Sequence, residues 1–105
     1  MELGNKGQIT ANYSNLGLLF IAQKKYEKAI EIYQQSIAIS ESIGQKDQAS
    51  TQYNNHGMIY SEIGKNNFAK DLFEKAITID RQLNRIGAYT TTFNNLGMMY
   101  VKDRQ

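Results

Sequence analysis

The chain has 105 residues, 41% hydrophobic and 21% charged, which is the composition of an ordinary globular domain and excludes a disordered segment. Its 12 basic and 10 acidic residues give a formal net charge of +2 and are scattered, so they form no basic patch for nucleic acid. Cysteine is absent and no apolar run approaches the roughly 20 residues of a membrane span, so we expect no disulfide, no thiolate metal site and no membrane insertion.

One string of residues occurs three times at a fixed interval. Residues 14–20 read SNLGLLF, residues 54–60 read NNHGMIY and residues 94–100 read NNLGMMY. Their central glycines are 40 residues apart at both steps. A repeat of this length predicts a solenoid of stacked units rather than one central core.

In chain order, the helical periodicity of apolar residues predicts five helices. They cover residues 9–23, 26–43, 48–63, 67–83 and 87–105. Gly4, Gly44 and Asn84 fall in register and are predicted to end helices, because both residue types tolerate the left-handed conformation found there. Short turns at residues 24–25 and 64–66 join the helices within a unit. We therefore predict an all-α fold built from helical hairpins.

The hairpins divide the chain into units of 40 residues. We assign residues 1–9 to the tail of a preceding unit and its turn, and residues 10–49 and 50–89 to two complete units. Residues 90–105 form the first helix of a third unit. Neither end coincides with a unit boundary, so we expect the sequence to be a piece of a longer array.

The repeated glycine lies inside the first helix of each unit, where glycine costs roughly 1 kcal/mol relative to alanine. A compensating gain is needed, and the simplest is a close approach of the paired helix. We expect Gly17 to lie opposite Ala29 and Gly57 to lie opposite Ala69, so that small residues face each other.

The same 40-residue spacing relates the other core positions of the two complete units. In the first unit they are Tyr13, Leu16, Gly17, Phe20, Ala29, Tyr33 and Ser36. In the second unit they are Tyr53, His56, Gly57, Tyr60, Ala69, Phe73 and Ala76. This pattern of aromatic, Leu-Gly, aromatic, Ala, aromatic and Ala resembles the tetratricopeptide-repeat family over essentially the whole chain. The resemblance implies an α-α superhelix, a solenoid of tetratricopeptide hairpins.

The chain departs from the common pattern of that family in three respects. Its period of 40 residues is similar to the longer-helix variety found in kinesin light chain, Pins-type spindle adaptors and many bacterial regulators. The proline that usually closes the second helix is replaced by Glu41 and Arg81, which is consistent with an extended helix. His56 stands where leucine is usual.

The resemblance also implies where a partner binds. In such a superhelix the first helices line the concave surface, and Asn15, Asn55 and Asn95 form a ladder across it. Asparagines at the matching place in the long-period relatives hold the backbone of a bound peptide. The other expected groove residues are Leu18, Met58 and Met98 as an apolar floor, with Thr51, Thr91, Glu62 and Lys102 beside them.

The same residues could have structural roles instead of binding a partner. The asparagines could instead cap a turn or bond to a neighbouring helix, and the apolar residues could pack between units. His56 is the only histidine and no cysteine accompanies it, which favours a packed histidine over a metal ligand or catalyst.

We therefore expect a protein-binding scaffold with no catalytic activity, no cofactor and no nucleic-acid or membrane partner. The sequence start, MELGNKGQIT, lacks the apolar core of a secretory signal, which favours a cytoplasmic location. The alternative is self-association into a homo-oligomer through the open ends of the array. That alternative depends on the last helix, which has no second helix to cover Leu96, Met99, Tyr100 and Val101.

Overall fold

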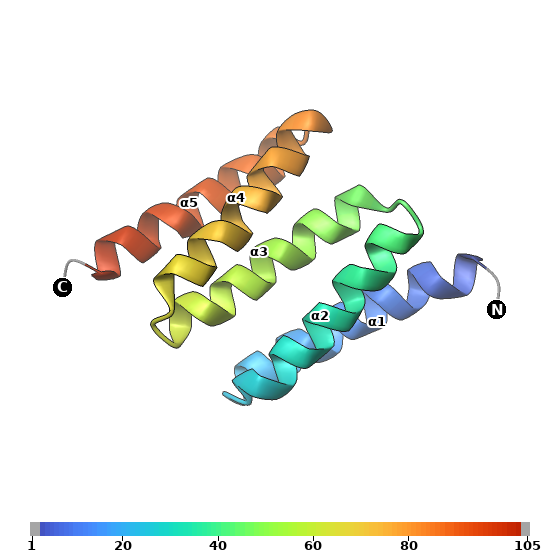
Figure 1. Ribbon diagram of the computed structural model, residues 1–105, viewed down its shortest axis with the longest axis horizontal. Coiled ribbons are helices and arrows are strands. Elements are labelled where there is room, and N and C mark those ends of the chain that lie inside the picture. The colour runs from blue at the N-terminus through green and yellow to red at the C-terminus, as the bar shows by residue number, and fades with distance from the viewer. Residues whose placement is uncertain (1–2, 104–105) are drawn as a thin grey trace.

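The structure, a computed structural model, describes residues 3–103, with side chains described for residues 10–102. It consists of five helices, and the described residues include no strand (Figure 1). Two hairpins and a final single helix follow one another, which confirms the predicted all-α solenoid. The helices are α1 (Leu3–Ala22), α2 (Tyr26–Ser42), α3 (Lys46–Glu62), α4 (Asn66–Gln82) and α5 (Ile86–Asp103).

The four junctions between helices share one geometry. A residue with positive φ occurs at intervals of 20 residues, and the residue after it donates its N–H to the carbonyl five positions earlier, as in Lys25 to Phe20 and Lys65 to Tyr60, both at 2.8 Å. This arrangement is the Schellman motif, which satisfies carbonyl groups at a helix end. The predicted stops at Gly44 and Asn84 are confirmed. The positive φ values are 61° at Lys24, 72° at Gly44, 83° at Gly64 and 59° at Asn84.

The N-terminal region differs from the prediction. Gly4 was predicted to end a helix and the residues after it to form a turn, but α1 is continuous from Leu3. Glycine permits the left-handed conformation without requiring it, and the helical conformation prevails here. The unit boundaries at residues 10–49 and 50–89 stay a prediction.

The helices form two layers. The first helices of the units contact one another, α1 with α3 and α3 with α5, whereas α2 and α4 do not approach within 8 Å between Cα atoms. Figure 1 views the stack from the side of α2 and α4, with α3 visible between them. The first helices α1, α3 and α5 are therefore closer to one another than the second helices α2 and α4 are, and they form a layer of their own. We call it the first-helix layer.

The repeated glycines lie under aromatic rings, which are the nearest neighbours of an added Cβ atom, and the predicted pairing of glycine with alanine stays a prediction. A Cβ atom added at Gly57 would lie 2.8 Å from the ring of Phe73, and one at Gly17 would lie 2.6 Å from the ring of Tyr33. The alanines belong to buried clusters that also include residues of the following unit. Ala69 packs with Phe73 and Met99. In the preceding unit, Ala29 packs in the same way with Tyr33 and Ile59.

The last helix is covered on one side only. Met99 is 2% exposed because it packs against α4, which corrects the expectation that it is uncovered. Phe93 corresponds in the repeat to the core residue Tyr53 and yet is 53% exposed. Nothing lies within 4 Å of a Cβ atom added at Gly97, in contrast to the two earlier glycines. The side of α5 that would receive an aromatic ring is therefore open.

Candidate functional site

The predicted asparagine ladder lies on the first-helix layer, but its three members have different surroundings. Asn15 is exposed, whereas Asn55 and Asn95 are half-buried. The Asn95 amide nitrogen Nδ2 donates to Oδ1 of Asn54 at 3.0 Å, which joins α5 to α3. The hydrogen bond shows that Asn95 has a structural role at that position, and it leaves the carbonyl end of the Asn95 amide for another partner.

Asn55 is linked to a buried tyrosine. The Tyr33 hydroxyl donates to the backbone carbonyl of Ser14 at 3.2 Å. Burial raises the pKa of Tyr33 to about 12, while hydrogen bonds from the Ser14 and Asn55 side chains act in the opposite direction. The tyrosine is therefore neutral at physiological pH, and its hydroxyl connects α1, α2 and α3.

A polar hollow of about 240 Å³ lies between α1 and α3. It includes two predicted groove residues, Asn15 and Thr51, together with six residues outside the predicted set. The Thr51 hydroxyl donates to the Asp47 carbonyl at 3.2 Å, so its oxygen remains able to accept a hydrogen bond. We call this region the polar hollow, and the further residues that line it are Ala11, Ser14, Asp47, Gln48, Gln52 and Arg85.

A second hollow, of about 330 Å³, lies toward the C-terminal ends of the first helices. Met58 and Met98 line it with Met99, and all three have the flexible thioether side chain that adapts to irregular surfaces. Asn95 and the charged pair Glu62 and Lys102 also line it. We call this region the methionine hollow. Leu18 is exposed but does not line either hollow.

The two charged groove residues predicted from the sequence pair with each other. Lys102 Nζ lies 3.4 Å from Glu62 Oε1, and both side chains are about half exposed. An exposed pair of this kind contributes roughly 0–1 kcal/mol. The remaining predicted groove residue, Thr91, donates its hydroxyl to the Gly87 carbonyl at 3.1 Å.

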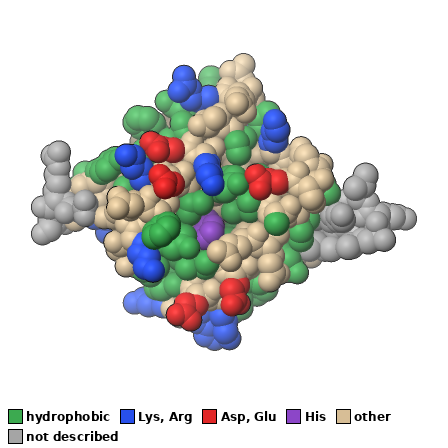
Figure 2. All heavy atoms as spheres, in the orientation of Figure 1, with side chains coloured by type: hydrophobic (Ala, Val, Ile, Leu, Met, Phe, Trp, Pro, Cys, Tyr) green, Lys and Arg blue, Asp and Glu red, His purple; other side chains and the backbone are tan. Residues whose placement is uncertain are grey.

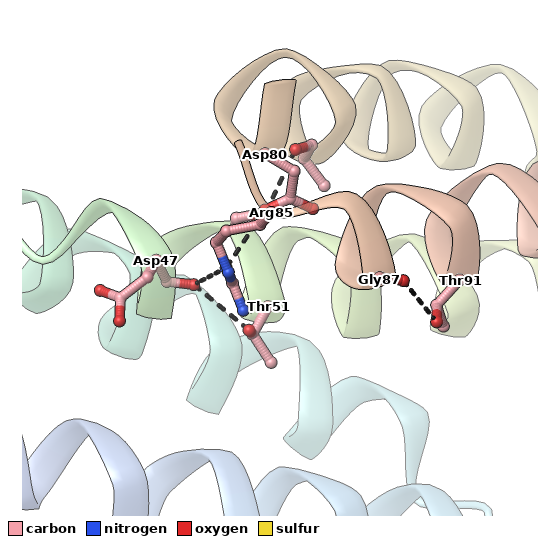
Figure 3. Close-up of polar contacts among 8 residues, drawn as sticks. Asp47, Thr51, Asp80, Arg85, Gly87 and Thr91 are labelled. Atoms are coloured by element: carbon pink, nitrogen blue, oxygen red, sulfur yellow. Dashed lines mark hydrogen bonds and ion pairs between the residues drawn. The ribbon is translucent and has the colours of Figure 1, made fainter. Parts of the chain in front are cut away.

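A buried ion pair fixes the edge of the polar hollow (Figure 3). Arg85, in the junction between α4 and α5, donates from Nη1 to the Asp47 carbonyl at 2.8 Å and to Asp80 Oδ1 at 3.1 Å. The same carboxylate oxygen accepts from the Ser50 hydroxyl at 2.6 Å. Asp80 is 2% exposed, so these two donors replace its hydration. The start of α3 is thereby tied to the end of α4.

Both the sequence and the fold of this chain match known proteins. A family model described as tetratricopeptide repeat matches residues 8–82. The chain belongs to the tetratricopeptide-repeat family. The crystal structure of BtubC (BKLC) from P. vanneervenii matches 90% of the chain with a TM-score of 0.80 at 26% identity, and this chain spans 39% of that protein. A comparison with curated proteins gives no significant match.

Tetratricopeptide repeats usually carry leucine where this chain has His56, and the histidine is packed. It is 5% exposed, and its ring stacks on Tyr33 and Tyr60 with centroid distances of 6.4 and 5.1 Å. Neither ring nitrogen has a hydrogen-bond partner among the described residues. Burial, with a smaller contribution from the Lys75 charge, lowers the pKa of His56 to about 4. Figure 2 shows the histidine recessed among hydrophobic side chains on the face of α2 and α4.

The described part of this tetratricopeptide array contains no group of three His, Cys, Asp or Glu side chains placed to hold a metal ion. Among its described helices, none combines the length and apolar character that crossing a membrane requires. Gln48 and Gln52 in α3 correspond to Gln8 and Asn12 in α1 and to Ala88 and Thr92 in α5, so amide side chains occupy these positions in two of the three copies. The repeat pattern therefore gave no signal that would have identified the two glutamines.

Proposed function

We propose that the chain binds an extended peptide segment of a partner protein along the first-helix layer. Tetratricopeptide repeats generally mediate protein–protein interaction, and the proposal specifies the surface and the form of the partner. The observation that carries it is the pair of hollows on one layer, one polar and one apolar. Each hollow is bordered by a member of the asparagine ladder, Asn15 in the first and Asn95 in the second.

An asparagine amide suits this role because it holds both donors and an acceptor. It can therefore pair with the N–H and C=O groups of an extended backbone at once. Asn15 is exposed, so its amide is available to a peptide. Thr51 and Thr91 keep acceptor capacity on their oxygens, because each hydroxyl donates within its own helix.

The test is a peptide-library selection on the purified chain and on Asn15→Ala. We expect the wild-type chain to enrich a set of related peptides and Asn15→Ala to bind them more weakly, by roughly threefold to tenfold for one lost hydrogen bond. Asn67→Ala, on exposed α4, is the matched control. Selection of the same peptides with equal affinity by Asn15→Ala contradicts a groove that uses this asparagine.

Single variants are preferable to a triple alanine variant of the ladder. Asn55 and Asn95 have structural partners in Tyr33 and Asn54, so replacing them also weakens helix packing. Asn15 has the most exposed amide of the three. A loss of binding in Asn15→Ala is therefore the easiest to attribute to the peptide.

Self-association through α5 is a second candidate function, favoured by a separate observation. The space above Gly97 is empty, whereas the matching space in the two earlier units holds an aromatic ring. Phe93, Tyr100 and Val101 are between 45% and 59% exposed on the same helix. Apolar faces of this kind favour association.

Sedimentation velocity over a range of concentrations tests this candidate. We expect the weight-average mass to rise with concentration in the wild-type chain and to stay at the monomer value in a Tyr100→Lys/Val101→Lys variant. Met99 is unsuitable for the variant because it is buried against α4. Leu18→Lys, which adds a charge on exposed α1, is the control. A wild-type chain that remains monomeric at every concentration rules this function out.

A further inference from the structure

Two glutamines that line the polar hollow have side-chain oxygens that no described residue satisfies and that solvent does not reach, so each side-chain amide must turn toward the hollow to meet a ligand donor. Gln52 is 2% exposed, and its amide nitrogen Nε2 donates to the Ser40 hydroxyl at 3.4 Å, while its oxygen Oε1 has no partner among the described residues. Gln48 Oε1 is likewise buried without a described partner. The two residues are four positions apart, so they share one face of α3. Both line the polar hollow.

Packing of the unit does not require these glutamines. At the corresponding positions of α5 the chain has Ala88 and Thr92, and Thr92 is as well buried as Gln52. Unpaired buried acceptors are destabilising, because the lost hydration is not replaced. The two unpaired acceptors therefore lower the stability of the unbound chain. A ligand that donates hydrogen bonds to them removes this cost.

The charges around the hollow favour a neutral donor. Asp47 and Arg85 both line it and have opposite formal charges. The Arg85 guanidinium is held by the Asp47 carbonyl and the Asp80 carboxylate, so its position is fixed. Arg85 is compensated by Asp80, whereas Asp47 is exposed and has no ion pair among the described residues, so an ammonium group on the ligand would be attracted to Asp47 and not to the glutamines. A carboxylate would lie close to the unpaired glutamine oxygens. A primary amide meets neither difficulty and has two N–H donors for two acceptors.

The second hollow sets the position of an apolar side chain relative to this amide. On α3, Gln52 lines the polar hollow and Met58 lines the methionine hollow. Six residues of helix correspond to about 9 Å along the axis. An extended peptide in the polyproline II conformation advances by about 3.1 Å per residue with three residues per turn, so two ligand side chains three residues apart lie on one side of it and about 9 Å apart.

We infer that the partner segment carries an asparagine or glutamine whose side-chain amide donates to Gln48 and Gln52, with a large apolar residue about three positions away in the methionine hollow. This inference rests on the proposed peptide-binding function and specifies its ligand. The amide determines which peptide binds, because an aspartate or glutamate at that position has no N–H to donate.

A random peptide library, selected on the wild-type chain and on Gln48→Met/Gln52→Met, tests the inference. Wild-type peptides are expected to show Asn or Gln at a fixed spacing from Met, Leu or Phe. The variant is expected to lose the amide preference and to keep the apolar one. Gln48→Met alone is the second variant, because Gln48 has no described partner to lose, and Gln34→Met on exposed α2 is the matched control.

Two measurements on one selected peptide complete the test. Its Asn→Asp and Asn→Leu forms should bind the wild-type chain at least about fivefold more weakly, the loss expected for one hydrogen bond with an unpaired group left behind. The Gln48→Met variant should bind the original peptide more weakly while melting at the same temperature as the wild-type chain or higher. A merely structural glutamine would lower the melting temperature and leave the amide preference intact.

The outcomes separate this inference from the proposed function. Groove-dependent peptides without an amide preference, or with the same preference in both glutamine variants, overturn the inference and leave peptide binding standing. Failure to select any peptide whose binding depends on Asn15 overturns both.

Discussion

Gly57 lies beneath a ring that cannot move away, because Phe73 is 1% exposed and packed on Ala69 and Met99. Gly57→Ala gains roughly 1 kcal/mol of helix propensity, but the added methyl group overlaps the ring, and overpacking costs about 1–3 kcal/mol. We expect a net loss of up to about 2 kcal/mol in the free energy of unfolding, measured by urea denaturation.

Gly97→Ala is the matched control for this prediction. A methyl group there enters open space, so only the gain in helix propensity remains, and the variant should be more stable by roughly 1 kcal/mol. Equal effects of the two substitutions would show that the ring of Phe73 does not set the requirement for glycine.

His56 makes stability depend on pH. Its folded-state pKa of about 4 lies below the ordinary value of 6.5, so between these values the unfolded chain binds a proton that the folded chain does not. The free energy of unfolding therefore falls as the pH is lowered from about 6.5 to 4, by at most about 1.4 kcal/mol per pH unit. Thermal unfolding at several pH values measures the slope.

The His56→Leu variant isolates this effect from the carboxylates, which titrate in both proteins. We expect the difference in stability between His56→Leu and wild type to grow in favour of the variant as the pH falls below 6.5. Near neutral pH, both ring nitrogens of the histidine are buried without a described partner, so the variant should already be at least as stable as the wild-type chain. Parallel pH profiles for the two proteins would contradict a buried, neutral histidine.

For single residues, the sequence predicted which positions are buried in the core but not which residues they contact. The 40-residue period placed Gly17 and Gly57 correctly in the core, yet periodicity along one helix does not say which residue of the next helix lies nearest. The rings of Tyr33 and Phe73 turned out to be the nearest neighbours of the two glycines. Such contacts depend on the angle between helices, which no single segment encodes.

Among the helices, the connection between α4 and α5 is held by a side chain that reaches back to α3. Arg85→Met leaves the buried Asp80 carboxylate with only the Ser50 hydroxyl among the donors described above, and it also frees the Asp47 carbonyl. We expect a loss of about 1–3 kcal/mol in stability, since a buried charge is left with fewer hydrogen bonds. Thermal unfolding measures the loss.

Arg81→Met is the control, because Arg81 is exposed one turn away and should change stability by less than about 0.5 kcal/mol. Amide hydrogen exchange adds a local readout. In Arg85→Met, protection should fall at the start of α3 and the end of α4 more than in α1. A uniform change along the chain would argue against a local clamp.

Helix bounds were predictable to within about two residues for α2 to α5, because the stop residues were chemically distinct. Lys24 shows the limit of that signal, since a lysine with φ of 61° occupies the same position as Gly44 and Gly64. Gly4 shows the opposite limit, since α1 continues through it. Residue type states what a backbone tolerates, and the neighbouring helices decide which conformation is used.

For the whole molecule, groove charge sets how binding responds to salt. Lys102 pairs with Glu62, and Arg85 pairs with Asp80. The charges that line the hollows without an ion pair among the described residues are Asp47 and Lys24, which have opposite signs. We expect the affinity for a selected peptide to change by less than about threefold when the salt concentration is raised tenfold. Fluorescence polarisation at several salt concentrations measures this, and a steep loss would show that charge dominates the interaction.

The groove as a surface was predictable only in part. Asn15, Thr51 and Met58 were identified from the face opposite the apolar stripe, and they do line hollows. Gln52 was not identified because its position on α3 reads as buried, and its unsatisfied oxygen becomes apparent only when α1, α2 and α3 are assembled. Residues of several helices line each hollow, so the sequence pattern of a single helix does not predict it.

The regular junctions have a consequence for how such a chain can lengthen. Each junction restarts the helix with the same backbone geometry, 20 residues after the last. Residues 46–85 therefore form a cassette: a tandem copy would begin and end in matching conformations and would need no new linker. Each inserted copy would bring its own Gln48 and Gln52 beside the asparagines of the preceding copy. Duplication would thus extend the fold and also multiply the polar hollow, so a longer binding surface with repeated amide preferences could arise in a single genetic step.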